Sequence, residues 1–409
     1  MVFLFSIGLF LTVMCLVVLG INAWVLIDTL LSTEVPPSIP HPMKLRILYY
    51  IFHLMVTWGT IFEKLRICSM PRFFQTIQDA MATKRNHNVA VTDLRFGEVP
   101  VRLFQPKATS SSPRRGILFY HGGGAVAGSL DYFHSLCSFL AQETDSVLLA
   151  VGYRKLPGYC HPFAIQDCVN ASIHFLKSPK AYGVDPSRVV VCGESLGGTA
   201  AAVVTQTLLG RPDLPPIRAQ VLIYPILQAI NLQLPSHLQN QNIPLLTTCI
   251  MFTFMFRYLA IDSSWKDAIL TGANVPPDTW MKYRKWLDSD NIPQRFRDKF
   301  QQPKLPAPFN KAAYLETKHM QDPGFSPLLA DNEVIAQLPE ALLVSMHWDI
   351  LRDDTLLYKK RLEDQGVPVT WYNVEDGFHG CIALFDNKTF SFPCSWSLIN
   401  AIVSFTKGI

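Results

Sequence analysis

The 409-residue sequence lacks a surplus of charge of either sign. It has 36 lysines and arginines against 32 aspartates and glutamates, and its net charge of +4 is small for its length. Basic side chains form no dominant run, which argues against a nucleic-acid partner. Apolar residues make up 49% of the chain, which argues against intrinsic disorder. The sequence therefore encodes a folded body with a large apolar core.

Closely spaced cysteine pairs and internal repeats are also missing. The nine cysteines show no Cys-x-x-Cys spacing, which excludes a zinc-finger pattern. No cluster of histidine, cysteine and carboxylate side chains indicates a metal, and we predict no cofactor. Cys15 and Cys192 lie in apolar segments, where we expect them to be small buried hydrophobes.

The first 27 residues contain no charged side chain. Their apolar run exceeds the ~20 residues that a helix needs to cross a bilayer. A cleaved signal peptide is the alternative, but the segment has no basic start and no clear small-x-small cleavage site. We therefore predict a transmembrane signal anchor over residues 1–27, in contact with a lipid bilayer. A shorter apolar patch at residues 47–62 is expected at the membrane interface or in a cap, and less readily as a second crossing.

The orientation of this anchor is weakly encoded, because few charges flank the first apolar run. Asn170 and Asn387 each begin an Asn-x-Ser/Thr triplet and are candidate glycosylation sites. Both triplets permit a lumenal body.

Apolar, β-branched runs alternate with segments of helical periodicity after residue 88. The expected strands cover residues 89–96, 99–104, 116–120, 146–153, 188–191, 220–225, 341–346 and 369–374. The expected helices cover residues 131–143, 163–177, 196–209 and 354–365. Strands that are apolar throughout are typical of a parallel sheet covered on both faces. This order predicts an α/β fold with a mainly parallel, eight-stranded sheet flanked by helices.

Two parts of the chain interrupt the alternation. Residues 28–88 are expected to be a linker and an N-terminal cap region, followed by a catalytic domain over residues 89–409. Within that domain, residues 228–325 form a proline-rich insertion between two strands. An insertion of this length is usually functional, and we expect a helical cap above a pocket.

One serine lies at a cramped junction between a predicted strand and a predicted helix. The stretch GESLG, residues 193–197, matches the Gly-x-Ser-x-Gly nucleophile elbow. Gly193 and Gly197 supply the room that a strained turn needs, so Ser195 would stand exposed at the end of the strand. The alternative is a glycine-rich turn of no catalytic meaning.

A second glycine motif, HGGG, follows an earlier strand at residues 121–124. Consecutive glycines can direct backbone amides toward one point, which would form an oxyanion hole. We expect the amides of Gly123, Gly124 and Leu196 to be the donors, with His121 and Gly122 supporting the loop. A phosphate-binding loop is the alternative, but the Gly-x₄-Gly-Lys-Ser/Thr pattern is absent.

A base and an acid follow the serine in the chain. His379 lies between glycines after the last predicted strand, and Asp349 follows the strand before it. The order Ser195, Asp349, His379 is that of an α/β-hydrolase triad. Asp376 is a rival acid, but it is close in sequence to the histidine that it would have to reach.

Other titratable groups near these motifs are expected outside the catalytic set. Asp353 and Asp354 follow the predicted acid and are interpreted as capping or surface carboxylates. His134, His161 and His347 are expected to be structural.

The motifs HGGG, GESLGG, DILRDD and DGFHG together resemble the hormone-sensitive-lipase branch of the α/β-hydrolases. The anchor and the stretches YRKLPGYCHPFAIQDC, GVDPSRVVVCGES and NKAAYLE are similar to arylacetamide deacetylase-like proteins. The resemblance covers nearly the whole chain. It implies a single-pass protein of the endoplasmic reticulum membrane (type II) with a lumenal catalytic body. It also implies hydrolysis of carboxylic esters, with amides as an alternative, of lipophilic acyl substrates.

Some positions depart from that family pattern. Leu196 replaces a small residue after the nucleophile, and Glu194 stands where aspartate is commoner. Val126 and Met346 occupy positions where relatives often carry a cysteine pair. A catalytically weak hydrolase-fold module that binds lipid or a protein partner is therefore the alternative function.

Overall fold

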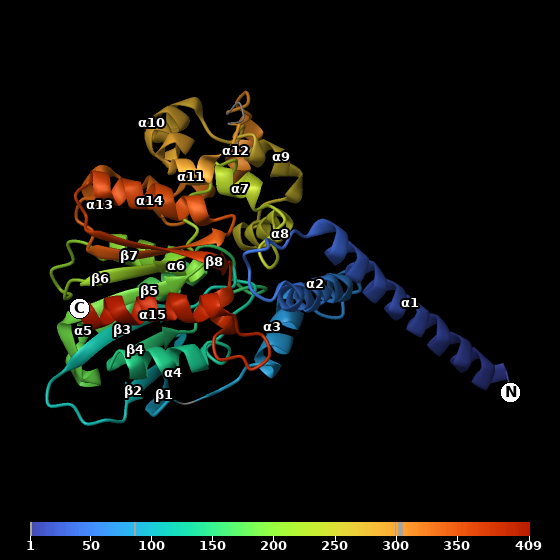
Figure 1. The fold of residues 1–409 in the computed structure, drawn as a ribbon, viewed down its shortest axis with the longest axis horizontal. Coiled ribbons are helices and arrows are strands. Elements are labelled where there is room, and N and C mark those ends of the chain that lie inside the picture. Colours follow the sequence, from blue (N-terminus) through green and yellow to red (C-terminus); the bar gives the residue numbers. More distant parts are fainter. Residues whose placement is uncertain (1, 86, 299, 302–305) are drawn as a thin grey trace.

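The computed structural model describes residues 2–85, 87–298, 300–301 and 306–409. One eight-stranded sheet forms its centre, in the strand order β1-β2-β4-β3-β5-β6-β7-β8 (Figure 1). The strands are β1 Val89–Phe96, β2 Val99–Pro106, β3 Arg114–Tyr120, β4 Ser146–Val151, β5 Val184–Glu194, β6 Ala219–Ile223, β7 Glu340–Trp348 and β8 Val369–Phe378. All eight predicted strands are present, and the predicted α/β-hydrolase fold is confirmed.

The sheet is parallel from β4 to β8 and antiparallel at one edge, where β2 pairs with both β1 and β4. The five parallel pairs explain the apolar character of the central strands, since helices cover both faces there. Parallel strands end at the same edge of a sheet, so the loops that follow β3, β5, β7 and β8 gather at one place.

Helices cover the two faces of the sheet in two groups. Side chains of α5 Phe163–Lys177, α6 Leu196–Thr207 and α14 Arg352–Asp364 share one core cluster with β5 residues Val189 and Val191. Side chains of α4 His134–Glu143 and α15 Pro393–Gly408 share the other cluster with Val190 of the same strand. Neighbouring residues of β5 thus point to opposite faces, and both faces are buried.

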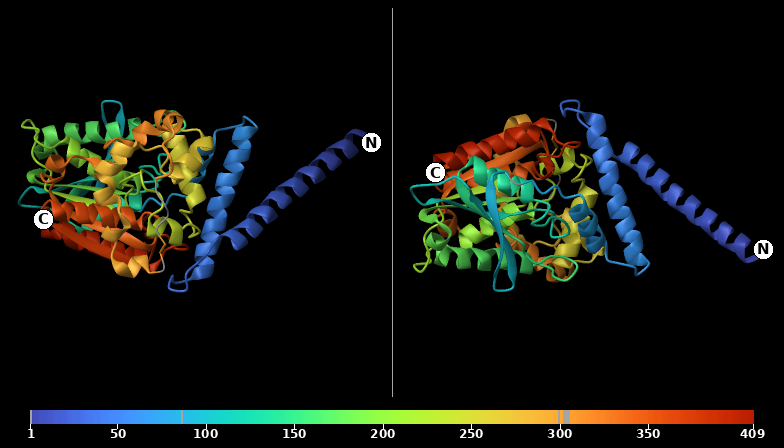
Figure 2. Two further views of the ribbon diagram at one scale, coloured as in Figure 1. Left: turned by 90° about the horizontal axis from the view of Figure 1, so that it is seen from above. Right: turned by 90° about the horizontal axis from the view of Figure 1, so that it is seen from below.

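Three helices precede the sheet. They are α1 Val2–Ser32, α2 Pro42–Lys64 and α3 Met70–Ala80. By length and composition α1 and α2 could each cross a membrane. Helix α1 projects away from the body, whereas α2 lies across one side of the body (Figures 1 and 2). The predicted patch at residues 47–62 lies within α2, and four of its residues, Leu48, Ile51, Phe52 and Met55, line a pocket.

The insertion between β6 and β7 is helical. It contains α7 Pro235–Gln239, α8 Thr248–Leu259, α9 Lys266–Leu270, α10 Pro277–Leu287, α11 Gln294–Arg297 and α12 Lys311–Thr317, and α13 Asn332–Ile335 follows it. Helix α8 contacts α2, as the ion pair at 2.6 Å between Arg257 of α8 and Glu63 of α2 shows. Two segments far apart in the sequence therefore lie together over the edge of the sheet.

Candidate active site

Ser195 lies in the tight turn between β5 and α6. Its backbone has φ 55° and ψ −125°, which a residue with a side chain adopts only when its surroundings impose them. A Cβ atom on Gly193 would lie 2.0 Å from the carbonyl oxygen of Gly197, and one on Gly197 would lie 2.0 Å from that of Tyr120. Both glycines of the motif are therefore sterically required.

The structure brings together the three side chains that the sequence singles out. Nε2 of His379 lies 2.9 Å from Oγ of Ser195, and Nδ1 of His379 lies 2.8 Å from Oδ2 of Asp349. Because an ionised carboxylate only accepts hydrogen bonds, the proton of a neutral imidazole belongs on Nδ1. Nε2 is then free to accept the hydroxyl proton. The rival Asp376 lies in β8, and the imidazole is paired with Asp349 instead.

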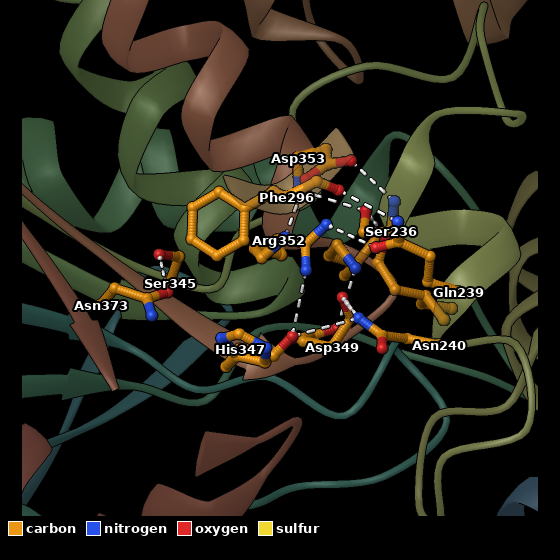
Figure 3. Close-up of polar contacts among 12 residues, drawn as sticks. Ser236, Gln239, Asn240, Phe296, Ser345, His347, Asp349, Arg352, Asp353 and Asn373 are labelled. Atoms are coloured by element: carbon orange, nitrogen blue, oxygen red, sulfur yellow. Dashed lines mark hydrogen bonds and ion pairs between the residues drawn. The ribbon is translucent and has the colours of Figure 1, made fainter. Parts of the chain in front are cut away.

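Asp349 is buried, with 1% of its surface exposed, and its Oδ1 accepts a hydrogen bond from the amide of Leu351 at 2.9 Å. A residue of the insertion supports the same loop. The Nδ2 group of Asn240 donates to the carbonyl oxygen of Asp349 at 2.9 Å and to that of His347 at 3.1 Å (Figure 3). Asp349 is therefore positioned by hydrogen bonds from its own loop and from the insertion.

The glycine loop after β3 leaves two amides available. Gly123 and Gly124 have φ of 95° and 58°, in the left-handed region that favours glycine. The amide of Gly122 donates to Oε1 of Glu194 at 2.7 Å. Within the described ranges, the amides of Gly123 and Gly124 donate to no other residue. Both glycines line the same pocket as Leu196, the first residue of α6.

His121 contacts the loop and not the serine. Its Nδ1 lies 2.8 Å from the carbonyl oxygen of Gly122, and its ring stacks on Tyr153 at 4.3 Å between centroids. The hydroxyl of Tyr153 donates to the carbonyl oxygen of His121 at 2.8 Å. Burial lowers the pKa of His121 to about 3, so the ring is neutral at pH 7.

An apolar pocket of about 250 Å³ lies over Ser195 and His379. Its walls come from both segments that meet above the sheet edge. They include Leu48, Phe52 and Met55 of α2, Phe74 of α3, and Met251 and Phe254 of α8. The serine hydroxyl therefore faces a space suited to an apolar group.

A family profile described as the alpha/beta hydrolase fold matches residues 117–280 and 281–383. The chain is 67% identical to arylacetamide deacetylase-like 4 family member 1 of Mus musculus, over 99% of this chain and 100% of that protein. It is 63% identical to arylacetamide deacetylase-like 4 of Homo sapiens, over 96% of each. The chain belongs to the arylacetamide deacetylase-like 4 family of α/β-hydrolases.

The fold of this chain also resembles that of a solved esterase. The hyperthermophilic esterase of Pyrobaculum calidifontis aligns with a TM-score of 0.61 and 23% identity, over 88% of this chain and 97% of that one.

In the sequence of this arylacetamide deacetylase-like 4 chain, Glu194 is noticeable only as a departure from the family pattern, whereas in the structure it contacts the glycine loop. The side chain of Glu194, 3% exposed, connects the nucleophile turn to the glycine loop through its hydrogen bond to Gly122. Burial raises the pKa of this carboxyl group. A residue next to the nucleophile can reach the loop after β3 because β3 and β5 are neighbours in the sheet.

The interpretation of Asp353 and Asp354 as surface carboxylates is wrong, since both are fully buried in the first turn of α14. Asp353 accepts from the amide of Ser236 at 2.6 Å, and Asp354 accepts from the amides of Leu227 and Gln228. Burial raises the pKa of Asp354 to about 7. The two carboxylates bind the insertion to the helix after the acid loop, and no sequence pattern distinguished them from solvated charges.

The other histidines named from the sequence make contacts of different kinds. His134 begins α4 beside Arg102, His161 packs against Tyr258, and His347 lies 3.0 Å from Glu375.

The nine cysteines form no disulfide in the part of the chain described, which includes all of them. Val126 and Met346, noted in the sequence as departures from the family pattern, are buried apolar residues. Cys192 is buried in β5, as expected, and Cys15 lies on the outward surface of α1, where only a surrounding bilayer would bury it.

Proposed function

We propose that this chain is a serine hydrolase that cleaves carboxylic esters of lipophilic acyl groups. The observation that supports it is the hydrogen-bonded series of Ser195, His379 and Asp349 beneath an apolar pocket. Similarity to arylacetamide deacetylases supports the same chemistry, because the chain is 33% identical to that of Mus musculus over 90% of this chain and 92% of that protein.

The proposed reaction begins when Oγ of Ser195 attacks the ester carbonyl carbon while Nε2 of His379 accepts its proton. Asp349 holds the Nδ1 tautomer and stabilises the imidazolium that forms. The negative charge that develops on the carbonyl oxygen is stabilised by the amides of Gly123, Gly124 and Leu196.

The intermediate then collapses, and His379 returns the proton to the departing alcohol. Water enters in place of the alcohol, gives its proton to His379 and attacks the acyl-serine ester. Collapse of the second intermediate releases the carboxylic acid and restores the Ser195 hydroxyl. No cofactor is required for these steps.

The substrate class follows from the pocket walls, which carry leucine, methionine and phenylalanine side chains from α2, α3 and α8. An apolar acyl or aryl group gains free energy by leaving water for such walls. Amides are a further substrate class, supported by the word deacetylase in the names of the relatives.

A fluorophosphonate probe tests the nucleophile, because it labels only an activated serine. The folded wild-type chain should be labelled and should hydrolyse esters from an acyl chain-length series, and Ser195→Ala should do neither. A folded wild-type chain without labelling would contradict the proposal. Labelling without turnover across the series would favour the alternative, a binding module in which Leu196 crowds the oxyanion position.

We also propose that α1 anchors the chain in the endoplasmic reticulum membrane, with the body in the lumen. The exposed apolar surface of α1 and the exposed position of Asn170 on α5 support this arrangement. Asn387 is half-buried, and its Oδ1 accepts a hydrogen bond from the amide of Thr389 at 3.0 Å.

Glycan analysis tests the proposed location. An endoglycosidase-sensitive glycan that disappears in Asn170→Gln is expected, with protection of the body from added protease in sealed microsomes. Digestion of the body in sealed microsomes would contradict a lumenal location.

A further inference from the structure

Helix α2 carries apolar side chains on two opposite sides. One side faces the body and includes the buried residues Leu45, Tyr49 and Val56. The opposite side follows the spacing of three and four residues that marks one helix face. We call this set the outer stripe of α2: Met43, Ile47, Leu54, Trp58, Ile61 and Leu65, the last directly after the helix.

The outer stripe is in contact with solvent at both ends. Met43, Ile47 and Leu65 are 64%, 50% and 63% exposed, and the members between them are half-buried. A helix that is apolar all round is typical of a buried or membrane-associated position. The body covers one side of α2 and α1 packs on another, so the exposed ends of the outer stripe are available to a second apolar partner.

The neighbouring helix α1 indicates what that partner is. Residues 3–20 of α1 are exposed, and about 18 residues at ~1.5 Å each span ~27 Å, close to the thickness of a bilayer core. Beyond them α1 packs on α2, where Oγ1 of Thr29 lies 3.3 Å from Nδ1 of His53. A bilayer that encloses the exposed part of α1 therefore ends close to α2 (Figure 2).

Charge around α2 and α3 favours the same partner. Residues 42–80 contain five basic and two acidic side chains, and the acidic Glu63 is already paired with Arg257. Lys64 and Arg72 are exposed, and neither has an ion-pair partner within the described residues. Basic side chains beside an apolar surface are attracted to the anionic headgroups of lipids.

The pocket reaches the surface next to this face. Ile51 and Met55 of α2 line the pocket from the flank between its inner side and the outer stripe. Met81, just after α3, lines the same pocket and is 54% exposed. A molecule at the outer face of α2 is therefore close to the mouth of the pocket.

We propose that the outer stripe of α2 lies in the headgroup region of the bilayer that α1 enters. Lipophilic esters then pass from the lipid into the pocket beside α2 and α3 without crossing bulk water. This inference rests on the proposed anchoring by α1 and, for its second part, on the proposed ester hydrolysis.

The contact itself is tested without activity, on the full chain in vesicles of phosphatidylcholine with a minor share of phosphatidylserine. A polarity-sensitive dye is attached to Leu65→Cys in a background where the exposed Cys15 and Cys249 are serine. The matched control is Met281→Cys on α10, 67% exposed and far along the insertion. Spin-labelled lipid should quench the dye at position 65 and not at 281, and equal responses would overturn the proposal.

The route of the substrate is tested with two esters, one long-chain and dissolved in the vesicle, the other short-chain and dissolved in water. The double variant Ile47→Glu, Leu65→Glu should lower the rate on the vesicle ester about tenfold, as charge on the apolar face weakens lipid contact. The rate on the soluble ester should stay within about twofold of wild type, and Met281→Glu should change neither rate.

The outcomes separate the two proposals. A wild-type chain that cleaves neither ester contradicts the proposed hydrolase activity, and the dye measurement still decides the lipid contact. A chain that cleaves both esters, with the double variant unaffected on the vesicle ester, overturns the route through the bilayer.

Discussion

Asn240 offers the sharpest test of how the insertion supports catalysis. It follows α7, is 1% exposed, and donates from one Nδ2 group to the carbonyl oxygens of Asp349 and His347. The first acceptor lies in the loop that carries the proposed acid, and the second lies near the end of β7, directly before that loop. Asn240→Ala removes both hydrogen bonds and touches no group that reacts with the substrate.

The expected loss of stability in Asn240→Ala depends on which hydrogen bonds the two carbonyl oxygens keep. The carbonyl oxygen of Asp349 still accepts from the amide of Arg352 at 3.2 Å, and that of His347 keeps a longer contact with the Arg352 guanidinium at 3.4 Å. Neither acceptor is left without a donor, so the loss is about 1 kcal/mol for each bond and ~2 kcal/mol in total. A displaced acid loop should lower kcat on the order of 10- to 100-fold, because small misplacements weaken catalysis steeply.

Urea unfolding and steady-state kinetics on a water-soluble ester measure both effects. We expect kcat to fall with little change in KM, because Asn240 is not among the residues that line the pocket. The matched control is Asn291→Ala, which removes a side-chain bond to the carbonyl oxygen of Lys285 at an exposed site and should cost less than ~0.5 kcal/mol. A folded Asn240→Ala chain with wild-type kcat and stability would refute the reasoning.

Three further changes test the site and the core. Asp349→Asn should lower kcat about 10⁴-fold, because an amide favours the wrong imidazole tautomer; kinetics with a check of folding measure this. Gly197→Ala should give a misfolded chain by circular dichroism, since its Cβ would lie 2.0 Å from the main-chain oxygen of Tyr120. Burial lowers the pKa of His237 to about 4, whereas the unfolded chain binds the proton below ~6.5. His237 should therefore lower the free energy of unfolding by ~1.4 kcal/mol per pH unit as the pH drops from about 6.5 to 4, and His237→Leu should reduce the slope measured by urea unfolding at several pH values by that amount.

The sheet could be predicted because its central strands are apolar on both faces, and hydrophobic runs identify such strands directly. The residues at which these strands begin and end are harder to predict from the sequence. Strand β5 was expected over residues 188–191 but covers Val184–Glu194, and its first part is polar and partly exposed. Pairing with β3 extends that part, as in the register of Arg114 with Val184, and hydropathy does not report pairing. Helix α15 was not predicted, although the apolar spacing of Leu398 and Ile402 would have indicated it.

The proposed nucleophile, base and acid could be found from the sequence because motif spacing and glycine positions identify their turns. The residues of the insertion that form hydrogen bonds to the acid loop could not be found from the sequence. Ser236 and Asn240 meet that loop only through tertiary contacts between residues more than 100 positions apart. Asp353 was interpreted as a capping or surface carboxylate, whereas it is buried and forms an ion pair at 2.9 Å with Arg352, which is buried as well (Figure 3).

The same insertion that shapes the pocket also holds the acid loop. Helix α8 lines the pocket with Phe254, and α7 contacts the acid loop through the Ser236 hydroxyl, which donates to the carbonyl oxygen of Ile350 at 2.7 Å. A displacement of the insertion would therefore alter the pocket walls and the support of Asp349 together. If α2 rests on lipid, its ion pair with Arg257 of α8 connects the membrane surface to this insertion. The proposed catalytic geometry and the proposed access from the bilayer would then both depend on this one segment of the chain.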